Sequence, residues 1–164
     1  MSVKTASVVL DGDGLRFKAT SGSGHTIILD NAEGNEGMRP AELLPVAIAG
    51  CTGMDVISIL RKKRQDVTGY RIEVNGTQMD GHPNAFLRMD VTHVVEGNGV
   101  DAEAVKRAIG LSATKYCSVG ATLASGIVTV AHGYRLIDAA TGAETSGEVV
   151  TEGPLHDPTP APAV

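Results

Sequence analysis

The chain has 164 residues, a net charge of −5 at pH 7 and only 3% aromatic residues. This length fits one compact domain and excludes a multi-domain machine, and the scarcity of aromatic side chains requires an aliphatic core. An acidic chain with few aromatic residues offers nucleic acids neither positive charge nor stacking platforms and does not attract anionic membranes, so we expect small-molecule chemistry without nucleic acid or membrane partners.

The first 30 residues have the pattern of three short strands. Residues 3–10 and 15–19 flank two consecutive Asp-Gly pairs, which are typical of a hairpin turn. Residues 25–30 follow a glycine-rich turn and are partly β-branched, which predicts a third strand. The start of the chain lacks the basic residues and the apolar stretch of a secretory signal, so we expect a cytoplasmic protein.

A long apolar helix is predicted after Pro40, because proline favours the first helical turn. The strongly polar members of residues 43–60 are Thr52, Asp55 and Ser58. Their spacing of three places them on one slowly drifting stripe. An apolar run of this length could also cross a membrane, but Asp55 in its middle and strands on both sides favour the buried core helix of a soluble domain.

Two strands, a second helical region and a last strand follow. Residues 67–77 and 85–95 alternate apolar and polar side chains around a turn-rich segment, which predicts an antiparallel pair. Asp101 can cap a helical region that Gly126 ends, and residues 127–137 form the last predicted strand.

This order of elements predicts an α+β fold. We assign residues 1–138 to one domain. Residues 139–164 lose the periodicity and contain four of the seven prolines, so we predict a disordered Pro-rich tail there.

One cysteine falls in each helical region. The glycines near Cys51, Gly50 and Gly53, leave open space beside its sulfur. Asp55 lies one turn later on the same helix face, where it either orders a donor near the thiol or belongs to a structural polar stripe. Cys117 lies near a lysine and a predicted helix start, and both favour a thiolate. Helical cysteines are more often small buried hydrophobes than catalytic groups, so these residues alone leave both roles open.

Three stretches of sequence form a recognisable pattern around the two cysteines. They are Pro40-Ala41-Glu42-Leu43-Leu44, Ala49-Gly50-Cys51-Thr52 and Lys115-Tyr116-Cys117-Ser118-Val119. Together they resemble the OsmC/Ohr family of osmotically inducible and organic hydroperoxide resistance proteins, over most of residues 1–137 and closest to its OsmC-like branch. The resemblance implies an intertwined homodimer in which two long helices pack centrally, antiparallel sheets wrap around them, and two thiol sites form at the subunit boundary.

The resemblance also implies thiol-dependent reduction of peroxides. Cys51 would be the peroxidatic thiolate that becomes a sulfenic acid, and Cys117 the resolving thiol that condenses with it. Organic hydroperoxides are the expected substrates, because an aliphatic pocket suits an alkyl tail. An unknown thiol reductant would restore the dithiol, and no cofactor is implied.

Members of this family activate the peroxidatic cysteine with an arginine that is held by a glutamate. Arg16, in the first hairpin, is the nearest equivalent of that arginine, and Arg39 is a second candidate. The glutamate's place directly after the helix-starting proline is taken by Ala41, and this chain offers Glu42 instead. On a continuous helix Glu42 would lie opposite Cys51, so it would reach the thiol only through a kink or from the partner subunit.

Two other functions remain open on the sequence. One is a non-catalytic dimeric binding module, in which an apolar cleft holds a small apolar or sulfur-containing ligand and the cysteines are merely buried. The other is a thiol that acts on substrates other than peroxides, in sulfur transfer or redox sensing. The five histidines show no metal-ligand spacing, so we expect no metal site.

Overall fold

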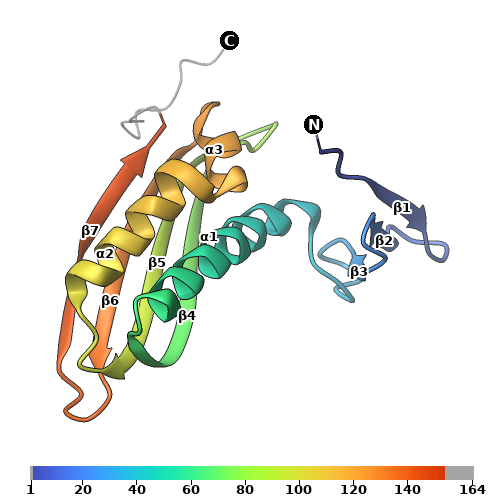
Figure 1. The fold of residues 1–164 in the computed structure, drawn as a ribbon. Helices are drawn as coiled ribbons and strands as arrows, with labels where there is room; N and C mark the ends of the chain where they lie inside the picture. Colours follow the sequence, from blue (N-terminus) through green and yellow to red (C-terminus); the bar gives the residue numbers. More distant parts are fainter. Residues whose placement is uncertain (1, 154–164) are drawn as a thin grey trace. The chain divides into compact units, whose positions relative to one another are not determined.

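The computed structural model describes residues 2–153, which form two compact units, one ending at Leu44 and the other beginning at Pro45 (Figure 1). Residues 1–138 were expected to form a single domain, and the structure divides that range at the first turn of the long helix.

The first unit is a small antiparallel sheet in the order β1-β2-β3. The strands are β1 (Ala6–Leu10), β2 (Phe17–Ser21) and β3 (Thr26–Leu29). Leu10 pairs with Phe17, and Gly12 in the connecting turn has a φ of +98°, a conformation that glycine adopts without strain. These pairings confirm the predicted hairpin and third strand. The unit ends in a 3₁₀ turn, η1 (Pro40–Glu42).

The second unit has a four-stranded sheet in the order β4-β5-β6-β7, with its helices on one face (Figure 1). The strands are β4 (Asp66–Gln78), β5 (Phe86–Asn98), β6 (Thr129–Asp138) and β7 (Glu144–Glu152). The helices are α1 (Leu43–Lys62), α2 (Ala102–Leu111) and α3 (Ser118–Ala124), with a π-helical turn, η2 (Ser112–Tyr116), between the last two. The Asp101 side chain caps α2 by accepting a hydrogen bond from the Glu103 N–H, as predicted.

The sequence-based description of this sheet was wrong in two respects. It expected antiparallel sheets, but β5 and β6 are parallel, because the crossover through α2, η2 and α3 brings the chain back in the same direction. It also assigned residues 139–164 to a disordered tail, but β7 pairs with β6 as the edge strand of the sheet. The rest of the predicted tail, residues 154–164, lies outside the described residues.

The core of the second unit consists of two apolar clusters, one around Val56, Val105 and Ile109 and the other around Ile48, Met89 and Val130. A layer of buried polar side chains lies between them. On β5, Val91 belongs to one cluster, Val95 to the other, and His93 occupies the inward position between them. The buried members of this polar layer are Thr52, His93, Ser112 and His132.

The segment Pro40–Lys62 is long and apolar enough to cross a membrane by length and composition alone. Within the unit, however, α1 behaves as a core helix. Ile48, Val56 and Leu60 are fully buried in the two apolar clusters, and Thr52 is buried between them. We therefore interpret α1 as the core helix that the sequence analysis favoured.

Candidate functional site

The structure brings the two cysteines together within one chain. Cys51 lies in the middle of α1 and is half-buried, whereas Cys117 is buried between η2 and α3. Both are free thiols, and they lie close enough together that the Cys51 side chain contributes to the raised pKa of Cys117. The two cysteines are therefore neighbours in the fold although they are 66 positions apart in the sequence.

The π-helical turn fixes the position of Cys117. The Cys117 N–H donates to the carbonyl oxygen of Ser112 at 2.8 Å, which closes the turn. Cys117 then leaves the helical conformation, with φ −72° and ψ 98°, and becomes the N-cap of α3. Its sulfur accepts a hydrogen bond from the Gly120 N–H at 3.2 Å. The break between α2 and α3 thus turns the Cys117 side chain to a defined position.

The two thiols have different environments. Burial, followed by the hydrogen bond to Cys51, raises the pKa of Cys117, and the opposing hydrogen bond from the Gly120 N–H does not compensate for them. Cys117 therefore keeps its proton at neutral pH and can donate it to the sulfur of Cys51. This asymmetry favours Cys51 as the nucleophile and Cys117 as the protonated partner.

A buried hydroxyl network ties the two cysteine-bearing segments together. The Thr52 hydroxyl on α1 lies 2.9 Å from the Ser112 hydroxyl on η2, and the Ser112 hydroxyl donates to the Asp55 carboxylate at 3.0 Å. Since the single Ser112 proton is used toward Asp55, the Thr52 hydroxyl is the donor in the first bond. Asp55, for which the sequence left two roles open, therefore accepts a hydrogen bond in this network.

A second polar chain crosses the sheet. The Tyr70 hydroxyl lies 2.7 Å from Nδ1 of His93, and Nε2 of His93 lies 3.5 Å from Nδ1 of His132. Burial, together with the charge of Asp55, raises the pKa of Tyr70, so its hydroxyl is the donor. Burial lowers the pKa of His93 to about 3 and that of His132 to about 4, so both rings are neutral at pH 7.

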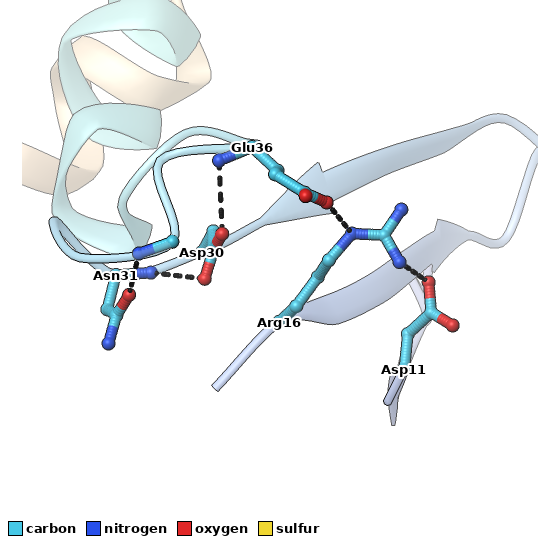
Figure 2. Close-up of polar contacts among 6 residues, drawn as sticks. Asp11, Arg16, Asp30, Asn31 and Glu36 are labelled. Carbon is cyan, nitrogen blue, oxygen red and sulfur yellow. Dashed lines mark hydrogen bonds and ion pairs between the residues drawn. The ribbon is translucent and has the colours of Figure 1, made fainter. Parts of the chain in front are cut away.

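Arg16 lies in the first unit and is held by two carboxylates (Figure 2). Its Nη1 pairs with Asp11 across the hairpin, and its Nε lies 3.0 Å from the carboxylate of Glu36. Beside this pair, the Asp30 carboxylate accepts hydrogen bonds from the Glu36 and Asn31 N–H groups, which lower its pKa. Arg16 thus has a glutamate partner, but that partner is Glu36 and not Glu42.

Arg39 and Glu42 form a separate pair in the same unit. The Arg39 N–H donates to the Glu42 carboxylate at 2.9 Å, and Nη1 of Arg39 lies 3.7 Å from the other carboxylate oxygen. Glu42 ends the 3₁₀ turn η1, and α1 begins at the next residue, Leu43. The regular α-helical spacing that would place Glu42 opposite Cys51 therefore does not extend to Glu42.

Sequence reasoning missed several members of these networks, above all Ser112, Glu36 and the buried Tyr70–His93 pair. The available signal was indirect. A buried hydroxyl such as that of Thr52 requires a partner, but the sequence does not say which residue supplies it. Glu36 belongs to an acidic loop whose fold could not be predicted from its composition.

Comparison with known proteins provides an independent view of the chain. The sequence model of the OsmC-like proteins matches residues 33–131. The protein YhfA of Escherichia coli K12 is 36% identical to this chain over 127 residues, which cover 77% of this chain and 94% of YhfA.

Solved structures have the same fold. A hypothetical protein from Aquifex aeolicus VF5 matches with a TM-score of 0.72 and 29% identity, over 84% of this chain and 98% of that chain. An OsmC-like protein from Mycoplasma pneumoniae matches with a TM-score of 0.70 and 16% identity, over 82% of this chain and 97% of that chain. The organic hydroperoxide resistance protein OhrB of Bacillus subtilis matches with a TM-score of 0.55 and 18% identity, over 81% and 98% of the two chains.

Proposed function

Since this chain belongs to the OsmC-like protein family, we propose that it is a thiol-dependent peroxidase that reduces organic hydroperoxides with Cys51 and Cys117. The observation that carries this proposal is the pair of neighbouring free thiols within one chain. Two neighbouring thiols, of which Cys117 keeps its proton at neutral pH, are what a nucleophile and a resolving group require. Peroxide-related stress defence is also suggested by the family itself, which includes organic hydroperoxide resistance proteins.

The first step oxidises Cys51. Its thiolate attacks the terminal oxygen of the hydroperoxide, the O–O bond breaks, and the alkoxide leaves with a proton as the alcohol. Two electrons pass from the sulfur to the peroxide, and Cys51 becomes a sulfenic acid. The protonated Cys117 thiol next to it stabilises the thiolate through its hydrogen bond.

The second step forms a disulfide. The sulfur of Cys117 displaces the hydroxyl group of the Cys51 sulfenic acid, and the thiol proton of Cys117 leaves with that hydroxyl as water. An external thiol reductant, whose identity the chain does not reveal, then supplies two electrons and two protons to restore both thiols. No cofactor takes part in this cycle, and two reduced thiols fit a protein of the cytoplasm.

Activation of Cys51 is assigned by the family resemblance to an arginine, and Arg16 and Arg39 are both kept as candidates. Each is paired with a carboxylate, Arg16 with Glu36 and Arg39 with Glu42. Replacing each arginine by glutamine and measuring the rate of Cys51 alkylation against pH identifies the activating group. The substitution that moves the alkylation profile to higher pH removes the cation that stabilises the thiolate.

The peroxidase proposal is tested by the consumption of cumene hydroperoxide with dithiothreitol as the reductant. We expect Cys51→Ser to abolish turnover, because serine is no nucleophile toward the peroxide bond at neutral pH. We expect Cys117→Ser to keep the first oxidation but to leave Cys51 as a trappable sulfenic acid. Ser118→Ala, which removes an exposed hydroxyl beside Cys117, is the matched control and should behave as the wild type. Absence of turnover in the wild-type protein, or full turnover in Cys51→Ser, would refute the proposal.

A specific observation also favours the alternative of a non-catalytic binding module. The first unit has a cavity of about 550 Å³ with an apolar lining that includes Val8, Phe17 and Leu29, and Arg39 is at its wall. Such a cavity suits a small apolar or sulfur-containing ligand. If the wild-type protein consumes no hydroperoxide, binding of a medium-chain thioether measured by calorimetry becomes the test of this second function.

A further inference from the structure

Ser112 connects the two cysteine-bearing segments through different atoms. Its carbonyl oxygen accepts the Cys117 N–H at 2.8 Å, and its hydroxyl lies 2.9 Å from the hydroxyl of Thr52, the residue that follows Cys51. The same hydroxyl donates to Asp55, one turn further along α1. A single serine therefore holds the backbone of one cysteine and the helix that carries the other.

The buried environment of Ser112 stabilises its hydrogen bonds to the two cysteine-bearing segments. Ser112 and Thr52 are both fully buried, so water does not compete for their hydrogen bond. Ser112 begins the π-helical turn, a local insertion in helical geometry that is common at functional sites. A regular α-helical turn would have bonded the Ser112 carbonyl to the residue before Cys117 instead, with the cysteine rotated accordingly.

We propose that Ser112, together with Thr52, is a positioning residue that sets the geometry in which the Cys51 and Cys117 sulfurs meet and form their disulfide. This inference deepens the proposed function and rests on it for its place in a catalytic cycle. It makes a separate statement about the dithiol, because a disulfide forms readily only when the two sulfurs and their Cβ atoms are held within a narrow range of geometry. Loss of the hydroxyl network should lower the effective concentration of one thiol toward the other.

The test measures the equilibrium between the Cys51–Cys117 dithiol and oxidised dithiothreitol, without any peroxide. In this exchange the protein loses two electrons and two protons to dithiothreitol as its disulfide forms, and free thiols are counted by alkylation and mass spectrometry. Thr52→Val is the central variant, since valine has the shape of threonine without its hydroxyl. We expect Thr52→Val and Ser112→Ala to lower the equilibrium constant on the order of tenfold, which corresponds to about 30 mV in the potential.

Two control variants distinguish the effect of losing the hydrogen bond from the effect of changed side-chain packing. Thr52→Ser keeps the hydroxyl but loses the methyl group, and Ser118→Ala removes an exposed hydroxyl next to Cys117; both should keep the wild-type equilibrium constant. In stopped-flow experiments with cumene hydroperoxide, Thr52→Val should form the Cys51 sulfenic acid at the wild-type rate and the disulfide on the order of tenfold more slowly. If Ser112→Ala does not fold, as judged by circular dichroism, the Thr52→Val and Thr52→Ser pair decides the matter alone.

The outcomes distinguish this inference from the proposed function. An unchanged equilibrium constant in folded Thr52→Val, or an equal shift in Thr52→Ser, overturns the positioning role whether or not the protein reduces peroxides. A shift confined to the variants that lack the hydroxyl supports it. Should the wild type form the disulfide but consume no hydroperoxide, the proposed peroxidase fails and the positioning of the dithiol stands.

Discussion

Thr52 and Asp55 show how far single residues can be interpreted from the sequence. Their spacing placed both on one stripe of an apolar helix, which was correct, but the partner of that stripe is Ser112, 60 residues from Thr52. A polar residue at a position predicted to be buried requires a hydrogen-bond partner. Its partner comes from tertiary packing, so neither periodicity nor composition could identify it.

The buried histidines His93 and His132 lead to a prediction about pH. Both have a pKa below the ordinary value in the folded chain, at about 3 and about 4, because burial opposes their charged forms. The unfolded chain takes up protons at these sites below about pH 6.5, whereas the folded chain does not. We therefore expect the free energy of unfolding to fall as the pH is lowered from about 6.5 to 4, by up to about 1.4 kcal/mol per pH unit for each histidine.

Urea unfolding between pH 4 and 7 measures this slope. His132→Gln removes one titrating ring and should lower the slope by up to about 1.4 kcal/mol per pH unit, the contribution of one proton. Equal slopes for His132→Gln and the wild type would mean that His132 does not carry the acid sensitivity.

Helices and strands were predicted correctly where their ends are marked by residues close to them in the sequence. Asp-Gly pairs predicted the first hairpin, and Asp101 was correctly identified as the cap of α2. The turn η2 could not be predicted, since residues 112–116 contain neither glycine nor proline to mark a change of helix type. Its geometry depends on the bonds of Ser112 to α1, which are tertiary.

Two glycines in different elements allow a paired prediction. A Cβ at Gly97 in β5 would collide with the carbonyl oxygen of Asp66 on the neighbouring strand, whereas a Cβ at Gly110 in α2 would meet nothing within 4 Å. Gly97→Ala should therefore lower the free energy of unfolding by about 1–3 kcal/mol. Gly110→Ala should raise it by about 0.5–1 kcal/mol, because alanine has the higher helix propensity.

Thermal and urea unfolding of the two alanine variants provide the measurement. Both substitutions add the same methyl group, so opposite changes in the free energy of unfolding would show that the surroundings of each glycine decide the effect. A stable Gly97→Ala protein would show that β4 can move away from the added methyl group at no cost, at the place where the β4–β5 register already shifts between Val67 and Gly69.

At the scale of the whole molecule, the fold class and the family were predictable, and the organisation of the sheet was not. The α+β order followed from alternating patterns, and the motifs around both cysteines indicated the family. The strand β7 was missed because its side chains are mostly polar and exposed, as in an edge strand. Such a strand is stabilised by its pairing with β6, and this pairing cannot be predicted from the residues of β7 alone.

The exposed side of α1 supports the proposed homodimer with α1 helices at its centre. Val46, Gly50 and Met54 follow each other at intervals of four residues and are exposed, and the relative accessible surface of Met54 is 70%. A second copy of the chain would bury this apolar stripe. We therefore expect sedimentation equilibrium to give twice the 16.9 kDa of one chain.

Met54→Lys should dissociate this dimer, because the new charge would have to be buried in an apolar interface. Ala140→Lys, which places the same charge in the exposed turn between β6 and β7, is its control and should remain dimeric. A monomeric wild-type protein at micromolar concentration would argue against the dimer and would leave the apolar stripe of α1 without a known occupant.

Because Cys51 and Cys117 belong to the same polypeptide, each chain holds a complete pair of redox-active sulfurs. Closing the disulfide is then a first-order event whose speed does not change on dilution. It also joins two helical segments that are already neighbours, so the oxidised chain needs no exchange of strands or subunits to return to its reduced state. Damage to one copy would leave the sulfur pair of its neighbour intact.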